Sequence, residues 1–569
     1  MQTPRQELIE IEKRLVKELK QRIYRSQERK NPVLDRYYND YVAEFSQGFE
    51  RAASRAELAD QLSRSHIAYF GDFHTLRSAQ SAMLSLLRET HERRRPVVLA
   101  LEMIHAAANP LAEALMNGEI TGKEFRKRAR WRRSWGFPWS SYRRLFEFAV
   151  AHKSPLFGLN IEPGPHKHDL AFRDQFAAQI IASLTQLYPN RLVAVLYGDL
   201  HLAQGHLPAE VDKLLAQFGA KRHSVRVYQN SETVYWKLVE QGLEQVVDIV
   251  KIKRDVYCVM NATPLVKFQS FSNWQDRTQE LEFNSLEDVG RELPGEMMLL
   301  DQIVGYAKTI CDFLGLPQQD TGAIELSTPA DLDFLSRLEQ RGVYSTREIA
   351  ALKEYLATAE TAYFPRVGVL YLAYLSVSHA AEGAMRVLLS LARPAGSGAV
   401  VDPRDEFYAR ILVEGLAFLG SKIINVKRKC RGLPEWTQVV ARTGRSRKLS
   451  PPEKLDLDVA RAVLRHHEFE LHVLDTGTFG AAPKNIYGLP TPVHVALTRA
   501  LGRWFGNQMF EAIMKGRLDK GLVRAAIVDN IRAPDVARNR YFAILEAIEK
   551  KPDDRSDDTD WHKKDGEEE

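Results

Sequence analysis

Cysteine is scarce in this sequence: the chain of 569 residues has three, and they lie far apart. Disulfide frameworks need an even number of cysteines and cysteine-based zinc sites need closely spaced ones, so we expect neither. The N-terminal stretch lacks the apolar run of a secretion signal and has no cysteine near its start that could carry a lipid. We therefore expect a protein of a reducing compartment, the cytoplasm.

Long apolar runs, an excess of one charge and glycine-rich phosphate loops are also missing. The longest uncharged run, residues 367–381, is too short to span a bilayer, so we expect no membrane span and predict a core helix over residues 367–391. The 79 basic residues nearly balance the 74 acidic ones, and no expected strand precedes a nucleotide-binding glycine pattern. The sequence therefore favours neither nucleic acid nor nucleotide as a partner.

Short apolar runs alternate with helical segments in the first half of the chain. The runs of strand length cover residues 66–70, 97–101, 155–159, 192–197 and 224–228. Strands separated by single helices form right-handed crossovers and a parallel sheet with helices on both faces. The sequence therefore predicts an α/β fold, a three-layer α/β/α domain with a mainly parallel sheet over residues 63–270.

Other segments surround this pattern. Residues 1–62 are predicted to form an N-terminal helical arm, whose second helix covers residues 35–62. The α/β domain is expected to end in a linker near residues 261–274, after extra strands. These extra strands are predicted at residues 234–238, 246–253 and 255–260. Residues 551–569 are highly charged, and we expect them to be disordered.

From about residue 285 helical periodicity dominates, which predicts an all-α domain over residues 285–550. We expect this domain to bind a partner protein or to form a homodimer. It contains two polar groups, His379 with Glu382 and residues 466–468 with His472. Because the repeated Glu-x-x-His motifs of a di-metal bundle are absent, we interpret both groups as polar core or surface residues.

Polar side chains follow the predicted strands at the points where these end. The sequence Gly-Asp-x-His occurs twice after an apolar run, at residues 71–74 and 198–201, and Glu102 and Asn160 follow two strands between them. Ligands of open α/β sheets bind outside the carboxyl ends of the strands, so we expect these side chains to form one site. Its predicted members are Asp72, His74, Glu102, Asn160, Asp199, His201 and His206.

In these motifs, residues 66 to about 230 resemble the ChaN-like haem-binding domain of the wider Tiki and erythromycin-esterase-like superfamily. The motifs that carry the resemblance are, in order, Gly71-Asp72-Phe73-His74, Glu102-Met103, Trp135-Gly136-Phe137-Pro138-Trp139 with Tyr142, Leu159-Asn160, Arg173-Asp174 and Gly198-Asp199-Leu200-His201. The family commonly has Glu where this chain has Asp72, and its histidine-rich stretch is missing here. The resemblance implies an α/β/α fold and a haem-binding role in iron uptake, while relatives in the superfamily include metal-dependent proteases and esterases.

Binding of haem or iron is therefore the first functional hypothesis. Arg77 or Arg173 could pair with the carboxylates of haem, and Tyr142 could ligate iron through its phenolate. Trp135, one of three tryptophans spaced by four residues, could cover a flat macrocycle, although aromatic residues at helical spacing also suit core packing. The expected ligand-binding residues are Arg77, Trp135, Tyr142, Asn160 and Arg173.

A metal-dependent hydrolase is the second hypothesis. Imidazole and carboxylate groups at strand ends could hold a divalent metal, or His74 could act as a base while a carboxylate fixes its tautomer. The catalytic residues would then be His74, Asp72 and Glu102. The expected metal ligands are His74, Asp199, His201 and His206.

Two further interpretations stay open. The protein could be a non-catalytic scaffold that binds a partner through its helical domain. The polar residues at the strand ends could also be buried hydrogen-bond partners that hold the strand-to-helix turns together, because Asp commonly caps the next helix.

Overall fold

The computed structural model describes residues 2–26, 32–162, 169–283, 294–321, 324–329, 334–356, 358–393, 402–443, 449–479 and 486–549. The chain divides into two compact units. Residues 14–287 form one, which we call the sheet unit, and residues 1–13 with 288–569 form the other, the helical unit. The tail for which we expect disorder, residues 551–569, lies outside the described residues.

The sheet unit is built on an eight-stranded sheet in the order β1-β7-β8-β6-β2-β5-β3-β4. The six strands from β8 to β4 run parallel, whereas at one edge β7 pairs antiparallel with both of its neighbours, β8 and β1. The strands are β1 Arg51–Ala52, β2 Ile67–Asp72, β3 Val97–His105, β4 Leu156–Asn160, β5 Leu192–Gly198, β6 Ser224–Gln229, β7 Ile249–Lys253 and β8 Val256–Val259. The mainly parallel sheet predicted from the alternation of strands and helices is confirmed.

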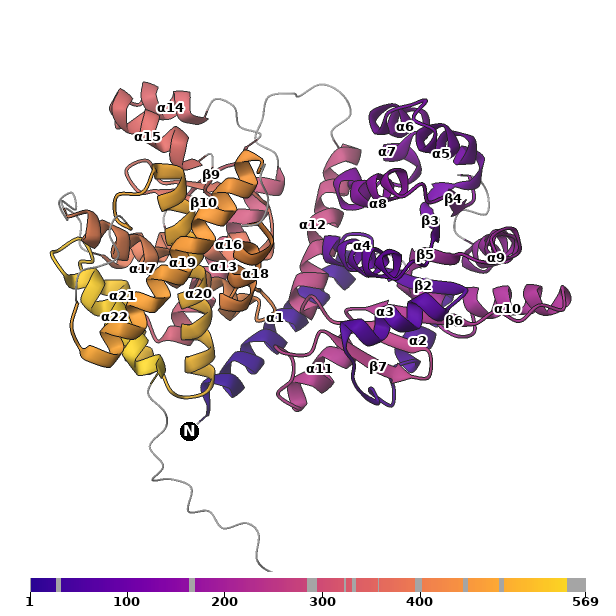
Figure 1. Ribbon diagram of the computed structural model, residues 1–569, viewed down its shortest axis with the longest axis horizontal. Coiled ribbons are helices and arrows are strands. Elements are labelled where there is room, and N and C mark those ends of the chain that lie inside the picture. The colour runs from indigo at the N-terminus through magenta and orange to yellow at the C-terminus, as the bar shows by residue number, and fades with distance from the viewer. Residues whose placement is uncertain are drawn as a thin grey trace, which may run out of the picture. The chain divides into compact units, whose positions relative to one another are not determined.

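Helices cover both faces of this sheet, with α4 and α8 on one face and α9 and α10 on the other (Figure 1). Buried side chains of β2, β3, α4 and α8 form one continuous apolar core between the sheet and its first helical layer. The helices of this unit are α2 Pro32–Ala43, α3 Arg55–Arg64, α4 Arg77–Glu92, α5 Asn109–Met116, α6 Gly122–Arg128, α7 Trp131–Ser134, α8 Trp139–Ala151, α9 Leu170–Leu187, α10 Leu207–Gln217, α11 Glu232–Glu240 and α12 Pro264–Phe283, together with the part of α1 Pro4–Ser26 from Arg14 onwards.

The strand order opens a crevice between β2 and β5. The chain leaves β2 through α4 towards β3, and leaves β5 through α10 towards β6 on the opposite side of β2. Two right-handed crossovers that start in opposite directions from neighbouring strands lie on opposite faces of the sheet. The carboxyl ends of these two strands therefore face an open space, and both end in Gly-Asp-x-His.

Three predictions for the sheet unit are wrong. Residues 234–238 belong to helix α11 and not to a strand, because Ser231 precedes a helix whose buried residues recur at helical spacing. The expected linker near residues 261–274 is mostly helix α12, where the Thr263 side chain accepts a hydrogen bond from the Val266 amide. The expected helix 35–62 is broken into α2, the short strand β1 and α3.

The helical unit is mainly helical, as predicted, but it also contains a sheet of three short strands in the order β10-β11-β9. The strands are β9 Glu325–Ser327, β10 Thr361–Phe364 and β11 Val369–Leu372. The helices are α13 Pro294–Leu314, α14 Phe334–Gln340, α15 Thr346–Leu356, α16 Val377–Ala392, α17 Pro403–Ile424, α18 Leu433–Thr443, α19 Pro451–Thr476, α20 Thr491–Met514, α21 Lys520–Val528 and α22 Val536–Glu549.

The core helix predicted over residues 367–391 is therefore wrong in its first part. The run Val369–Leu372 is a fully buried strand, and the helix begins only after Ser376, whose side chain caps it by accepting from the His379 amide. Within the described residues, no helix is both long and apolar enough to cross a membrane.

Candidate functional site

Glycine brings the two Gly-Asp-x-His turns into contact. Strands β2 and β5 pair so that Asp72 lies opposite Gly198. A Cβ atom on Gly71 would lie 1.7 Å from Oδ1 of Asp199, so only glycine leaves room for that carboxylate. A Cβ atom on Gly198 would lie 3.4 to 3.6 Å from atoms of three side chains, those of His74, Glu102 and His201. Asp72, His74, Glu102, Asp199 and His201 thus surround the carboxyl ends of β2 and β5, two neighbouring strands in the middle of the strand order.

His74 is held by a carboxylate beneath it. Its Nδ1 atom lies 2.9 Å from Oδ2 of Asp72, and the buried Tyr142 hydroxyl donates to the same oxygen at 2.9 Å. Partial burial lowers the pKa of the His74 imidazole, but the hydrogen bond and charge of Asp72 outweigh it and raise the pKa above its ordinary value. Among the described residues, Nε2 of His74 has no hydrogen-bond partner, so this nitrogen remains available to a ligand.

Glu102 and Arg173 form a second pair. Arg173 donates from Nη2 to Oε1 of Glu102, and the Gly198 amide donates to Oε2 at 2.7 Å. Burial raises the pKa of Glu102, but the charges of His74 and Arg173 outweigh burial and hold this pKa below its ordinary value. Glu102 is therefore ionised at neutral pH, and Arg173 is bound to it.

His201 has a carboxylate partner of its own. Its Nδ1 atom lies 2.6 Å from Oδ1 of Asp174 in helix α9, and Tyr37 of helix α2 donates to the other oxygen of Asp174 at 2.8 Å. His206 lies 3.0 Å from Asp40 through Nε2 and stacks on the Tyr37 ring with the two ring centres 3.7 Å apart. The two histidines are thus fixed by separate carboxylates.

Asp199 is the least satisfied group of the site. It is buried, with 5% of its surface exposed, and neither carboxylate oxygen has a hydrogen-bond partner in the described part of the chain. The ammonium group of Lys267, in helix α12, lies 3.7 Å from Oδ2, which is beyond hydrogen-bond distance. Burial raises the pKa of the Asp199 carboxyl to about 6, the charge of Asp72 adds to this increase, and Lys267 opposes it.

These groups line a cavity of about 900 Å³ in the sheet unit. The Trp135 ring lies against His74, with ring centres 4.7 Å apart, and Phe137 lies against the same imidazole at 4.9 Å. The aromatic lining residues are Tyr38, Tyr41, Phe73, Trp135, Phe137, Trp236, Phe268 and Phe271. The cavity therefore combines aromatic walls with a polar floor, as binding sites for small molecules commonly do.

The structure brings most of the predicted site residues to this cavity. Those that line it are Asp72, His74, Glu102, Trp135, Asn160, Arg173, Asp199 and His201. Three others do not line it. Arg77 is exposed at the start of α4, Tyr142 is buried against Asp72, and His206 lies beside Asp40.

Several lining or supporting residues were not among the predicted site residues. Asp174 in α9 and Tyr37 in α2 orient His201. These two helices are far from His201 in the sequence and come close to it only when the sheet unit is folded. Lys267, Phe268 and Phe271 come from α12. The signal that could have found this helix is Thr263-Pro264, a capping residue followed by proline at the first helical position.

Among the described residues, no three His, Cys, Asp or Glu side chains are arranged so that they could hold one metal ion. Of the four residues predicted as metal ligands, each of the three histidines has a carboxylate partner of its own, at Asp72, Asp174 or Asp40.

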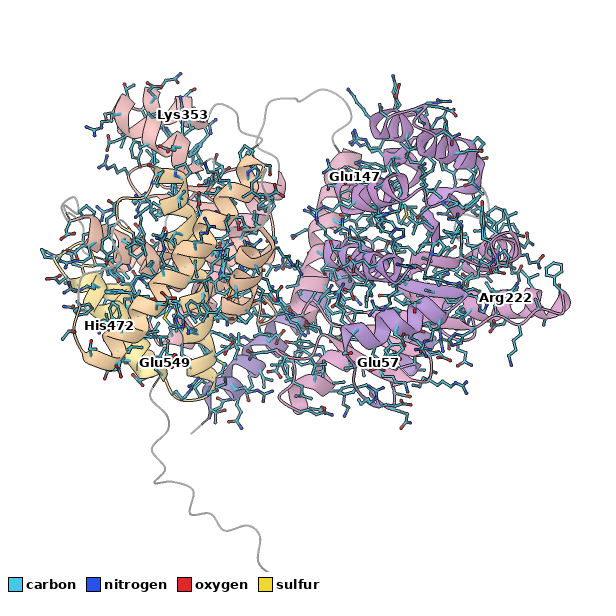
Figure 2. All side chains as sticks on the ribbon, in the orientation of Figure 1. Glu57, Glu147, Arg222, Lys353, His472 and Glu549 are labelled. Carbon is cyan, nitrogen blue, oxygen red and sulfur yellow. The ribbon has the colours of Figure 1, made fainter. Side chains whose placement is uncertain are left out.

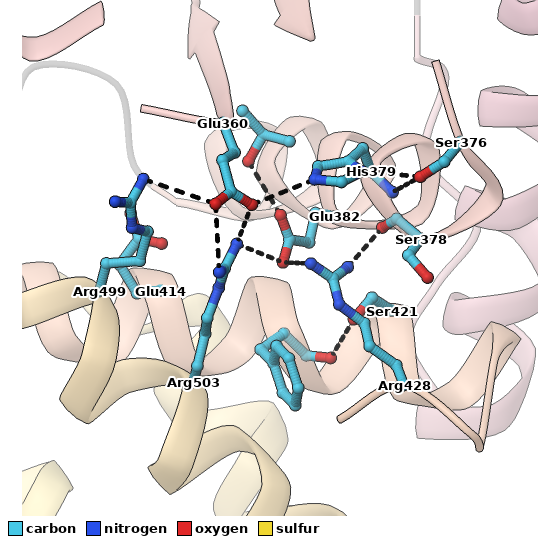
Figure 3. Close-up of polar contacts among 12 residues, drawn as sticks. Glu360, Ser376, Ser378, His379, Glu382, Glu414, Ser421, Arg428, Arg499 and Arg503 are labelled. Carbon is cyan, nitrogen blue, oxygen red and sulfur yellow. Dashed lines mark hydrogen bonds and ion pairs between the residues drawn. The ribbon is translucent and has the colours of Figure 1, made fainter. Parts of the chain in front are cut away.

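The helical unit contains a second cluster of charges, but it has no room for a ligand. Glu382 pairs with Arg428 and Arg503, and Arg503 also pairs with Glu360, which His379 contacts through Nε2 at 3.1 Å (Figure 3). The space beside the cluster is about 10 Å³, which is less than a ligand needs. The cluster is a matched set of opposite charges in the core.

The polar group predicted around residues 466–472 is divided in the same unit. His466 is fully buried, and its Nδ1 atom lies 3.0 Å from Oε1 of Glu470. His472 is exposed on the outside of helix α19 (Figure 2). One member is thus part of the core and the other part of the surface.

Comparisons with known proteins point to one family. Residues 58–165 match the family model described as "Haem-binding uptake, Tiki superfamily, ChaN". The resemblance to ChaN found in the sequence is confirmed for this segment. One solved structure is similar to part of this chain and is described as "Cofacial heme binding to ChaN of Campylobacter jejuni". The aligned region covers 32% of this chain and 87% of the ChaN chain, with 16% sequence identity and a TM-score of 0.27. No curated protein matches the chain.

Proposed function

We propose that the sheet unit binds haem in the cavity at the carboxyl ends of β2, β3 and β5, with His74 as the residue that faces the iron. The observation that carries this proposal is the pairing of His74 with Asp72 on the floor of an aromatic cavity. A histidine that ligates a metal almost always donates its other N–H to a carboxylate or carbonyl, which fixes the tautomer and makes the ligating nitrogen more basic.

The residues present fit a haem group. Haem is flat and largely apolar, and Trp135, Phe137 and Phe271 offer aromatic surface on the cavity wall. Asp72 accepts from Nδ1 of His74, so the neutral imidazole presents the lone pair of Nε2. Bound haem would supply an iron centre for ligand binding or electron transfer. The protein would supply the imidazole, the apolar wall and the exclusion of water.

The family match supports the same ligand. Residues 58–165 match a model whose description names haem-binding uptake, and this segment contains His74, Glu102, Trp135 and Asn160. Tyr142, expected as a ligand, would instead act through Asp72, because its hydroxyl is buried and donates to that carboxylate.

A haem titration of the full-length protein tests this proposal. Wild type should give a saturable Soret band at one haem per chain, and His74→Ala should weaken binding by about tenfold or more because the imidazole that would hold the iron is lost. His472→Ala is the matched control, since His472 is exposed in the helical unit. A wild-type protein without a saturable spectrum, or a His74→Ala variant that binds as wild type does, would contradict the proposal.

A hydrolase is the second candidate, and one observation favours it. His74, with its tautomer fixed by Asp72, and Asp199, with a pKa of about 6, line the same cavity and form a candidate base and acid. Screening ester and peptide substrates, with elemental analysis of the same sample, tests it. Turnover that is lost in both His74→Ala and Asp72→Asn would support a hydrolase, and turnover unchanged in His74→Ala would exclude this assignment.

A further inference from the structure

Lys267 is a buried cation on the cavity lining, with 7% of its side chain exposed. Its ammonium group donates to the carbonyl oxygen of Asn230 at 3.0 Å and lies 4.7 Å from the centre of the Phe73 ring. Asp199 is its nearest carboxylate, at 3.7 Å. An ammonium group carries three donors, and the one hydrogen bond found for it among the described residues goes to Asn230.

The other cations on the lining are held more closely by carboxylates. Arg173 is hydrogen-bonded to Glu102, Lys20 lies 2.8 Å from Glu232, and Lys237 lies 3.0 Å from Glu240. Among the lining cations in the described part of the chain, Lys267 is the one whose carboxylate partner is beyond hydrogen-bond distance. An incoming carboxylate therefore displaces no hydrogen bond between side chains there.

Asp199 lies next to Lys267, and we call these two residues the polar corner of the cavity. Both of its oxygens are buried without a hydrogen-bond partner among the residues that the structure describes, although Asp199 lines the cavity. Buried polar atoms without partners destabilise a protein, so the donors of Lys267 that no described residue accepts from are suited to an acceptor group of a ligand.

This corner lies outside the segment that matches the family model. That match ends at residue 165, whereas Lys267, Phe268 and Phe271 all belong to helix α12. The helix therefore adds a cation between aromatic walls to the cavity of this chain.

We propose that Lys267 is the residue that recognises a carboxylate of the ligand in this cavity, so that the site selects planar acids over their esters. This inference rests on the proposed haem-binding function. The ligand carboxylate accepts hydrogen bonds from the free donors of Lys267 while the aromatic part of the ligand lies against Phe268 and Phe271. A charge-assisted hydrogen bond in a buried site favours the acid over the ester by about tenfold or more.

The test is a pair of titrations of the full-length protein, one with iron protoporphyrin IX and one with its dimethyl ester. Wild type should bind the acid about tenfold more tightly than the ester. Lys267→Met should bind both with the affinity that wild type shows for the ester, and Lys267→Arg should retain the preference because it retains the charge. Lys237→Met is the matched control, since Lys237 lines the cavity but is paired with Glu240, and its preference should be that of wild type.

The outcomes separate the two proposals. If neither porphyrin binds to wild type, haem binding fails and the role of Lys267 fails with it. If both porphyrins bind equally well to wild type, or if Lys267→Met keeps the preference for the acid, haem binding stands and the role of Lys267 is overturned. Circular dichroism spectra that match wild type show whether each variant is folded.

Discussion

Nδ1 of His74 lies 2.9 Å from Oδ2 of Asp72, although the two residues are only two positions apart in one turn. A short turn after a parallel strand thus supplies both an imidazole and the carboxylate that fixes its tautomer. The second Gly-Asp-x-His turn does not repeat this pairing, because His201 takes its carboxylate from Asp174 and leaves Asp199 to face Lys267. Two copies of one motif therefore serve different purposes.

Asp72→Asn should lower the pKa of His74 and weaken haem binding by about tenfold to a hundredfold. The amide can still accept from Nδ1, but the charge that raises the pKa of the imidazole is lost. The pKa is measured by NMR titration of the His74 ring protons. In the matched control, Asp174→Asn, the charge at Asp72 is kept, so the pKa of His74 should change little. An unchanged pKa in Asp72→Asn would contradict this assignment.

Asp199→Asn should change how the stability of the sheet unit depends on pH. The pKa of Asp199 is about 6 in the folded protein and near 3.9 in an unfolded chain, so the folded state holds this proton more tightly. Wild type should therefore lose stability as the pH rises from about 4 to about 6, by about 3 kcal/mol from this residue. The stability of Asp199→Asn should not fall in this way over the same pH range, because the amide does not titrate.

Hydrogen exchange of amides in β2 and β5 measures this difference locally in the sheet unit. The free energy of opening in Asp199→Asn, minus that of wild type, should rise across the same pH range. A difference between the two proteins that stays constant with pH would show that Asp199 does not titrate in this range.

Glu382→Gln should destabilise the helical unit by about 3 to 5 kcal/mol. The carboxylate is buried between Arg428 and Arg503, so its loss leaves two cations in the core without this counter-charge (Figure 3). Glu348→Gln is the control, because Glu348 forms an exposed ion pair with Arg366 and should change stability little. Thermal unfolding of both variants measures the effect, and equal melting temperatures would rule out a structural role for the cluster.

Gly71→Ala should destabilise the sheet unit by about 1 to 3 kcal/mol and weaken ligand binding. The new methyl group would overlap Oδ1 of Asp199, which forces that carboxylate out of its place on the cavity floor. Gly205→Ala is the matched control in the same unit, since among the described residues no atom beyond its own chain neighbours lies within 4 Å of the added Cβ. Denaturant unfolding and a haem titration measure both effects; a variant as stable as Gly205→Ala would show that the turn has room for a side chain.

Local patterns were sufficient to predict strands β2 to β6, although β3 continues to His105, so that Glu102 lies within the strand and does not follow it. Buried parallel strands are short apolar runs, and β2, β3, β4, β5 and β6 all lie where such runs were found. Because parallel strands end at one edge of a sheet, Asp72, His74, Glu102 and Asp199 could be assigned to one site before the strand order was known. Local patterns failed where an apolar run suits a strand and a helix equally, as at residues 234–238 and 367–372.

Only the tertiary structure decided how these groups are paired and what closes the cavity. Asp174 reaches His201 from α9 and Tyr142 reaches Asp72 from α8, each across many residues of chain, and α12 brings Lys267 to 3.7 Å from Asp199. The sequence by itself determined that an acid, an imidazole and an amide follow the strands. Which carboxylate meets which imidazole depends on the order of the strands and the packing of the helices, because hydrogen bonds need contact within about 3 Å.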